Sequence, residues 1–145
     1  MFVRQISIYL ENIRGTLCEL TKLLGEAGID LKALSIADTA NFGIVRCIVA
    51  EEDIEKTTEL LRANGHISKV NSVICVCVPD KPLGLSNILS LLEKEDISIE
   101  YTYSFYKNTG DNAVIIIRPS EKTKTVALLE ANEIKMLTQN DINSL

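Results

Sequence analysis

The stretch ISIYLENIRGTLCELTKLLGEAGIDLKALSIAD, residues 6–38, decides the fold of this chain. Its apolar beginning, Ile6–Leu10, predicts a β-strand, and the turn Glu11–Gly15 leads from this strand into a helical pattern. The apolar residues of that pattern recur at the spacing of one α-helix face: Leu17, Leu20, Leu23, Leu24 and Ala27. Gly28 predicts the end of the helix, because glycine adopts a positive φ without strain, and a second strand follows over residues 29–37.

The start of this helix is a candidate site for an anion. The first amides of an α-helix have no partner inside the helix, and the helix dipole adds partial positive charge there. A strand, a glycine turn and a helix start can therefore hold a carboxylate or phosphate without a charged side chain. We expect the amides of Gly15, Thr16 and Leu17 to bind the carboxylate of a small ligand.

The composition bounds the size and the partners of the protein. With 145 residues, of which 46% are hydrophobic, the chain can form one ordinary domain or two small ones. The net charge is −5 and Lys and Arg form no cluster, which argues against nucleic acid. The N-terminus does not read as a signal peptide, and no apolar run approaches the ~20 residues of a membrane-spanning helix. We expect a cytoplasmic protein with neither nucleic acid nor membrane as a partner.

Side chains that carry metal or catalytic chemistry are scarce. Cys75 and Cys77 share one face of a strand, but the second pair of ligands that a zinc site needs is missing, and Cys18 and Cys47 stand alone. We expect core cysteines without disulfides, and His66, the only histidine, in a surface loop. The sequence contains no triad pattern and no phosphate loop of the Gly-x-x-x-x-Gly-Lys kind. These observations predict no metal, no cofactor and no enzyme activity.

The rest of the first half completes a recognisable order of elements. A strand is predicted over residues 43–49, and the acidic run Glu51–Asp53 precedes a helix over residues 54–64. After Gly65, an extended segment over residues 67–78 leads to a proline. The resulting order β-α-β-β-α-β is typical of the split βαβ fold.

The second half repeats the first at a constant offset of 68 residues. Leu60–Asn64 aligns with Leu128–Asn132, and no gap is needed anywhere between. The same offset relates further pairs: Leu17 and Leu85, Leu23–Leu24 and Leu91–Leu92, Ile29 and Ile97, Ile48 and Ile116, and Lys56–Thr57 and Lys124–Thr125. We therefore predict two units, residues 1–70 and 71–145, with the strand around residues 72–78 ending one and beginning the other.

Two units of this size bury too little surface alone, so we expect them to pack side by side. Each is predicted to be an α+β, ferredoxin-like unit with an antiparallel sheet of order 4-1-3-2 and helices on one face. Its second strand lies at an edge, so residues 33–37 and 101–105 are predicted to pair into a continuous eight-stranded antiparallel sheet. This joint would bring each helix-start turn beside the second strand of the other unit. The remaining open surfaces are expected to pair two chains into a homodimer.

The chain resembles the ACT domain, and in particular the small proteins that consist of two ACT units. The resemblance covers residues 2–137 and rests on Leu10–Asn12, Gly15-x-Leu17, Ala27–Ile29 and Ala33–Asp38, together with the doubled unit. The turn of the family usually reads Asn-x-Pro-Gly. The first unit has Arg14 in place of the proline, and the second reads Asp80-Lys81-Pro82-Leu83-Gly84, with its glycine one place later.

The resemblance implies a non-catalytic regulatory or sensor protein that binds a small amino acid at the interface between paired units. The implied partners are the free amino acid and an amino-acid biosynthetic enzyme. The alternative is a regulatory subunit or interaction protein of such an enzyme, without a small ligand of its own. That alternative predicts co-purification with a larger enzyme and an empty cleft.

The candidate site residues lie at the two turns and on the two edge strands. The first turn contributes Asn12, Ile13, Arg14, Gly15, Thr16 and Leu17, and the matching positions of the second unit are Asp80, Leu83, Gly84 and Leu85. The edge strands contribute Ser35, Ala37 and Asp38 from one unit and Tyr101 and Tyr103 from the other.

Several of these residues have a second interpretation from the sequence. Arg14 either offers a cation to the ligand or is a solvated turn residue, and Asn12 either caps the helix or contacts the ligand. Asp38 either accepts the ligand ammonium group or forms a turn. Tyr101 and Tyr103 either pack on the sheet or form a wall for a flat ligand group.

Overall fold

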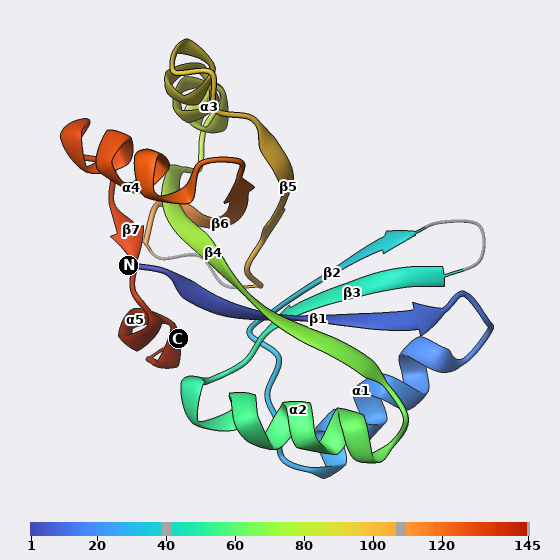
Figure 1. The fold of residues 1–145 in the computed structure, drawn as a ribbon. Helices are drawn as coiled ribbons and strands as arrows, with labels where there is room; N and C mark the ends of the chain where they lie inside the picture. Colours follow the sequence, from blue (N-terminus) through green and yellow to red (C-terminus); the bar gives the residue numbers. More distant parts are fainter. Residues whose placement is uncertain (39–41, 107–109, 145) are drawn as a thin grey trace. The chain divides into compact units, whose positions relative to one another are not determined.

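The computed structural model describes residues 1–38, 42–106 and 110–144 (Figure 1). The chain divides into two compact units, which we call unit N (residues 4–71) and unit C (residues 72–145 together with 1–3).

Unit N contains three strands, two α-helices and the first part of a strand that continues into unit C. In chain order the elements are β1 (Val3–Glu11), α1 (Thr16–Glu26), β2 (Ala33–Asp38), β3 (Phe42–Ile48), a 3-10 turn η1 (Glu51–Asp53), α2 (Ile54–Ala63) and β4 (Ile67–Pro79). This order confirms the predicted β-α-β-β-α-β pattern. The predicted turn residues 39–41 lie outside the described residues.

Unit C repeats the pattern and adds a helix at its end. After β4 come α3 (Gly84–Lys94), β5 (Ile99–Ser104), β6 (Asn112–Pro119), α4 (Lys122–Ala131), β7 (Met136–Leu137) and α5 (Gln139–Asn143). Helix α5 was not expected from the sequence. Its start is a capping box, in which the Asp141 amide donates to Thr138 Oγ1 (3.3 Å) and the Thr138 amide donates to Asp141 Oδ2 (2.7 Å). The fully buried Ile142 anchors the helix.

The described strands form a seven-stranded sheet of order β2-β3-β1-β4-β6-β5, with β7 also paired to β4. The α+β class and the continuous antiparallel sheet are confirmed. The predicted eight strands become seven because the last strand of unit N and the first of unit C are one strand, β4. Since β4 makes the sheet continuous, β2 and β5 stand at opposite ends of the order, and the prediction that residues 33–37 pair with 101–105 in one chain is wrong.

The core of unit N lies between its strands and its two helices, which cover the same face (Figure 1). Ile6 and Ile8 of β1 are fully buried there. Leu20 and Leu24 of α1 and Leu61 of α2 are at most 1% exposed. Burial of one such side chain contributes about 2 kcal/mol, so this cluster is the main source of stability of the unit.

Unit C has an equivalent core. Ile74 and Val76 of β4 pack with Ile88 and Leu92 of α3 and with Leu129 of α4. All five are at most 5% exposed. Both helices again cover one face of the strands (Figure 1), as the predicted fold requires.

The same side-chain hydrogen bond occurs inside each unit, at positions that are 68 residues apart. Thr57 Oγ1 donates to the Asp53 carbonyl (2.6 Å), and Thr125 Oγ1 donates to the Glu121 carbonyl (2.7 Å). Both threonine side chains are fully buried, so this bond satisfies a polar group that would otherwise destabilise the core. The repeat read from the sequence therefore extends to individual polar contacts.

The first helix of each unit ends in the same backbone motif. At the end of α1 the Gly28 amide donates to the Gly25 carbonyl (2.9 Å) and the Ile29 amide to the Leu24 carbonyl (3.0 Å), with Gly28 at φ +74°. This confirms the predicted helix end. At the end of α3 the same position is Asp96, at φ +55°, where a residue with a side chain is less stable than glycine.

The cysteines divide into three buried thiols and one exposed thiol. Cys47, Cys75 and Cys77 are buried as predicted, and burial raises the pKa of the Cys47 thiol to about 12. Cys18 is exposed, so the prediction of a core position is wrong for this residue. Position 18 follows the core-facing position 17 by one residue, which rotates its side chain about 100° around the helix, away from the core.

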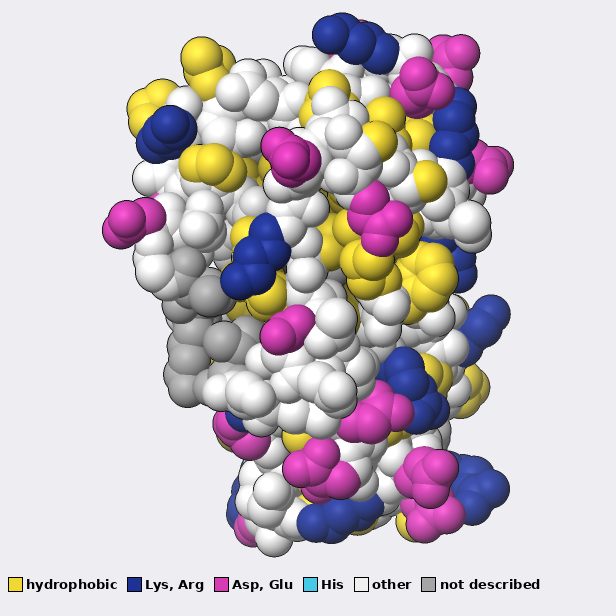
Figure 2. Space-filling view, turned by 90° about the vertical axis from the view of Figure 1, so that its left-hand side faces the viewer, with side chains coloured by type: hydrophobic (Ala, Val, Ile, Leu, Met, Phe, Trp, Pro, Cys, Tyr) yellow, Lys and Arg dark blue, Asp and Glu magenta, His cyan; other side chains and the backbone are white. Residues whose placement is uncertain are grey.

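The described part of the chain offers no metal site and no membrane span. No group of three or more His, Cys, Asp or Glu residues there could hold a metal ion. None of its helices has the length and apolar character that crossing a membrane requires. On the face in Figure 2, Lys and Arg side chains are interspersed with Asp and Glu, so no basic surface for nucleic acid forms there.

Candidate functional site

The turn between β1 and α1 is fixed by its own hydrogen bonds. The Ile13 amide donates to the Glu11 carbonyl (2.9 Å), and the Thr16 amide donates to the Ile13 carbonyl (3.3 Å). Thr16 Oγ1 adds contacts to the carbonyl oxygens of Ile13 (2.9 Å) and Glu11 (3.1 Å). Gly15 adopts φ +97°, a conformation that strains any other residue, which explains the glycine at this position.

The start of α1 leaves two amides available. Its first helical bond runs from the Glu19 amide to the Gly15 carbonyl (3.0 Å), and no side chain caps this end. Within the described part of the chain, the amides of Leu17 and Cys18 therefore have no hydrogen-bond acceptor. Of the three predicted donors, the Thr16 amide is used inside the turn, whereas the Gly15 and Leu17 amides have no acceptor among the described residues.

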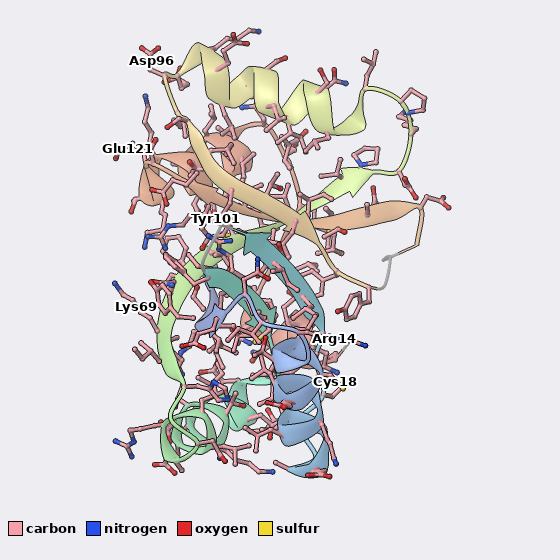
Figure 3. All side chains as sticks on the ribbon, turned by 90° about the vertical axis from the view of Figure 1, so that its right-hand side faces the viewer. Arg14, Cys18, Lys69, Asp96, Tyr101 and Glu121 are labelled. Carbon is pink, nitrogen blue, oxygen red and sulfur yellow. The ribbon has the colours of Figure 1, made fainter. Side chains whose placement is uncertain are left out.

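A pocket of about 460 Å³ opens at this helix start. We call it the turn pocket, and its lining residues are Leu10, Glu11, Asn12, Ile13, Gly15, Thr16, Leu17, Cys18, Ile36, Gly43 and Val45. The structure thus brings together five predicted site residues: Asn12, Ile13, Gly15, Thr16 and Leu17. Arg14 is exposed and does not line the pocket; it and Cys18 lie close together at the start of α1 (Figure 3).

The walls of the turn pocket are aliphatic and contain no cationic side chain. Ile13, Leu17 and Ile36 provide apolar surface, and Gly43 leaves space beside them because it has no side chain. Glu11 supplies the carboxylate of the lining. The pocket therefore combines free amides at one end, an acidic group, and an apolar wall.

Ile36 is a pocket residue that the sequence reasoning missed. In the β2–β3 register Ile36 pairs with Val45, which also lines the pocket, whereas Ser35 and Ala37 pair with Arg46 and Ile44. Successive residues of a strand face opposite sides, so Ser35 and Ala37 face away from the pocket. Residues 34 and 36 share one side of the strand, so alternation from Leu34, which packs against the core of unit N, would have identified Ile36. The side chain of Asp38 lies outside the described part of the structure.

The second turn has the same backbone course with different residues. Leu83 takes the left-handed position of Gly15, at φ +69°, and the Asn87 amide donates to its carbonyl (2.9 Å). A Cβ on Gly84 would lie 2.1 Å from the Pro79 carbonyl oxygen. The glycine of this turn is thus displaced by one place because the backbone approaches closely there, and not because φ is positive.

The predicted residues of unit C do not gather in one pocket. Gly84 lines a separate pocket of unit C, whereas Asp80, Leu83 and Leu85 do not line it. Tyr101 and Tyr103 lie on β5 (Figure 3 shows Tyr101). In the β5–β6 register Tyr101 pairs with Arg118 and Tyr103 pairs with Ile116. Because β5 is not paired with β2, the structure gives no pairing that brings these tyrosines beside the first turn.

Two βαββαβ units with a pocket at a helix start define the ACT class of regulatory domains. The family described as ACT domain pair matches residues 1–145, so the chain belongs to this family. No curated protein matches the chain.

Solved structures agree with this assignment. A protein from Bacteroides thetaiotaomicron is 35% identical, with a TM-score of 0.89, over 100% of this chain and 98% of that one. The ligand-free regulatory subunit of aspartate kinase from Thermus thermophilus is 15% identical, with a TM-score of 0.63, over 88% of both chains. The corresponding subunit from Thermus flavus is 15% identical, with a TM-score of 0.60, over 88% of this chain and 91% of that one. At 15% identity the two kinase subunits show a shared fold alone.

Proposed function

We propose that this chain is a regulatory protein that binds a small amino acid in the turn pocket and carries out no chemistry itself. The observation that carries the proposal is that both free amides of the α1 start, on Leu17 and Cys18, belong to residues that line one pocket. Membership of the ACT domain pair family supports the regulatory role.

The ligand would lie with its carboxylate on the helix start and its side chain along the aliphatic wall. The dipole of α1 and its two free amides favour the carboxylate. Glu11 is placed to accept from the ammonium group, and Asp38, which pairs with the pocket residue Gly43, stays a predicted second acceptor. Ile13 and Ile36 would contact an apolar side chain.

Control of a partner would follow from a difference in affinity between two states. A ligand shifts an equilibrium only as far as it binds one state more tightly than the other. We propose that a homodimer of this chain, with paired ACT units closing over the pocket, is the favoured ligand-bound state. The partner would be a separate amino-acid biosynthetic enzyme.

A thermal-shift screen of the twenty amino acids at millimolar concentration tests the proposal, followed by calorimetry on any ligand that stabilises the chain. Replacing Ile36 with tryptophan should fill the pocket mouth and weaken binding at least about tenfold, or about 1.4 kcal/mol. Ile67→Trp is the matched control, because Ile67 is 71% exposed and does not line the turn pocket. Absence of any stabilising amino acid, or equal binding by both variants, would contradict the proposal.

An interaction protein without a small ligand remains the second candidate. The exposed apolar side chains near the turn, Tyr9 (42% exposed) and Phe42 (47%), favour a protein contact on this part of unit N. That function predicts capture of a larger enzyme with the turn pocket empty. Capture that is unchanged by amino acids and by Ile36→Trp would favour it over the sensor.

A further inference from the structure

A second pocket, in unit C, contains polar groups that neither the fold nor the turn pocket explains. It lies against α3, has a volume of about 440 Å³, and we call it the α3 pocket. Two lysines, Lys81 and Lys135, line it together with the carboxylate of Glu133. Ile88 and Leu91 of α3 form an apolar floor.

The charged groups of the α3 pocket, Lys81, Lys135 and Glu133, form no ion pair and no side-chain hydrogen bond within the described part of the chain. The Lys135 ammonium is near enough to Asp141 to help lower the pKa of that carboxyl, after the hydrogen bonds from Thr138. Two cations in one pocket are notable in a chain whose net charge is −5.

The internal repeat supplies a comparison for these residues. The positions 68 residues earlier carry no charge: Ile13, Ile67 and Gly65. Since unit N folds in the same way without charged side chains there, the charges of the α3 pocket are not a requirement of the fold. They are specific to unit C.

Glu133 also occupies an unfavourable backbone conformation. It follows the end of α4 at φ +56°, where its counterpart Gly65 has φ +78°. A glutamate in the left-handed region is less stable than glycine, and strained residues of this kind concentrate at functional sites. The carboxylate therefore stands at a position where glycine would be more stable.

We propose that the α3 pocket is a second ligand site, which binds a small amino dicarboxylate. The pocket holds two cations and one anion, and such a ligand holds two carboxylates and one ammonium group, so the charges are complementary. Lys81 and Lys135 bind the carboxylates, Glu133 accepts from the ammonium, and the floor contacts the methylene carbons. The turn pocket, which no lysine or arginine lines, takes a different class of amino acid.

Calorimetry on the full chain with L-glutamate and L-aspartate tests the proposal, with sodium chloride at matched ionic strength as the control. At least one of the two amino dicarboxylates should bind, and Lys81→Ala and Lys135→Ala should each weaken its binding about tenfold or more. Lys94→Ala is the matched control, because Lys94 lies on α3 outside this pocket and should leave affinity unchanged. No binding by either ligand, or equal losses in all three variants, would overturn the proposal.

Two further variants separate ligand binding from a structural role. Glu133→Gln should weaken binding of the amino dicarboxylate but not of succinate or glutarate, which carry no ammonium group. Glu133→Gly should raise the unfolding midpoint of the free protein while weakening the same ligand, which a purely structural residue would not do. Ile36→Trp should leave binding at the α3 pocket unaffected. The proposals for the α3 pocket and for the turn pocket can therefore be tested independently.

Discussion

Replacing Gly84 with alanine is the sharpest test of the second turn. The added Cβ would lie 2.1 Å from the Pro79 carbonyl oxygen and 3.2 Å from its carbonyl carbon. Both atoms belong to the backbone of β4, whose Pro79 pairs with Asn112 of β6, so neither can rotate away as a flexible side chain would. The chain must shift its backbone to accept one methyl group.

The size of the effect follows from two opposing terms. Overpacking of this kind costs about 1–3 kcal/mol, and contact with backbone atoms at such a short distance puts it near the upper end. Alanine is more favourable than glycine inside a helix by about 1 kcal/mol, which offsets part of the loss at the first residue of α3. We expect Gly84→Ala to lower the free energy of unfolding by about 2 kcal/mol, or Tm by roughly 4–8 °C.

Gly25→Ala is the matched control. Gly25 lies within α1, and a Cβ there has no neighbour within 4 Å. This variant should gain up to about 1 kcal/mol from helix propensity alone. Urea unfolding followed by circular dichroism measures both variants under the same conditions. If Gly84→Ala proves as stable as the wild type while Gly25→Ala gains stability, the close approach of α3 to β4 is refuted.

Four other predictions use helix ends and thiols. Asp96→Gly should stabilise the chain by about 0.5 kcal/mol, because relief of the left-handed strain exceeds the entropy of glycine in the unfolded chain; urea unfolding measures it. Thr138→Ala should cost about 1 kcal/mol and speed amide exchange in α5. A thiol reagent should label Cys18 in the folded chain and the other cysteines only after unfolding. The Cys47 pKa is raised from 9.0 to about 12, so its contribution to stability is complete below pH 9 and is lost toward pH 12, by up to ~1.4 kcal/mol per pH unit; Cys47→Ala should flatten this fall.

The fold could be predicted from the sequence because its signals are local or repeated. Gly28 marks a helix end through its own positive φ. The 68-residue offset relates the helices of the two units, and it also relates buried contacts such as the hydrogen bond of Thr57. The sharing of β4 by two units could be read from the same offset. The positions of β2 and β5 in the sheet could not be predicted from the sequence. They depend on which strand edges remain unpaired once both units share β4.

The candidate site could be predicted in part. The turn residues 12–17 could be found because a glycine before a helix is a backbone signal, and five of the six line the turn pocket. Ile36 was missed because a polar neighbour, Ser35, is the more obvious ligand contact, while the register decides which side of the strand faces the pocket. The α3 pocket could not be predicted, since Lys81 and Lys135 are distant in sequence and only the path from α4 to β7 brings them to the same cavity.

The single strand β4, residues 67–79, means that the two halves of this protein cannot be obtained by one cut. A cleavage anywhere along it deprives one half of an edge partner, and the exposed apolar strand left behind would favour aggregation. Fragments 1–79 and 67–145 would each keep all thirteen residues of β4, so neither half would end in a cut strand.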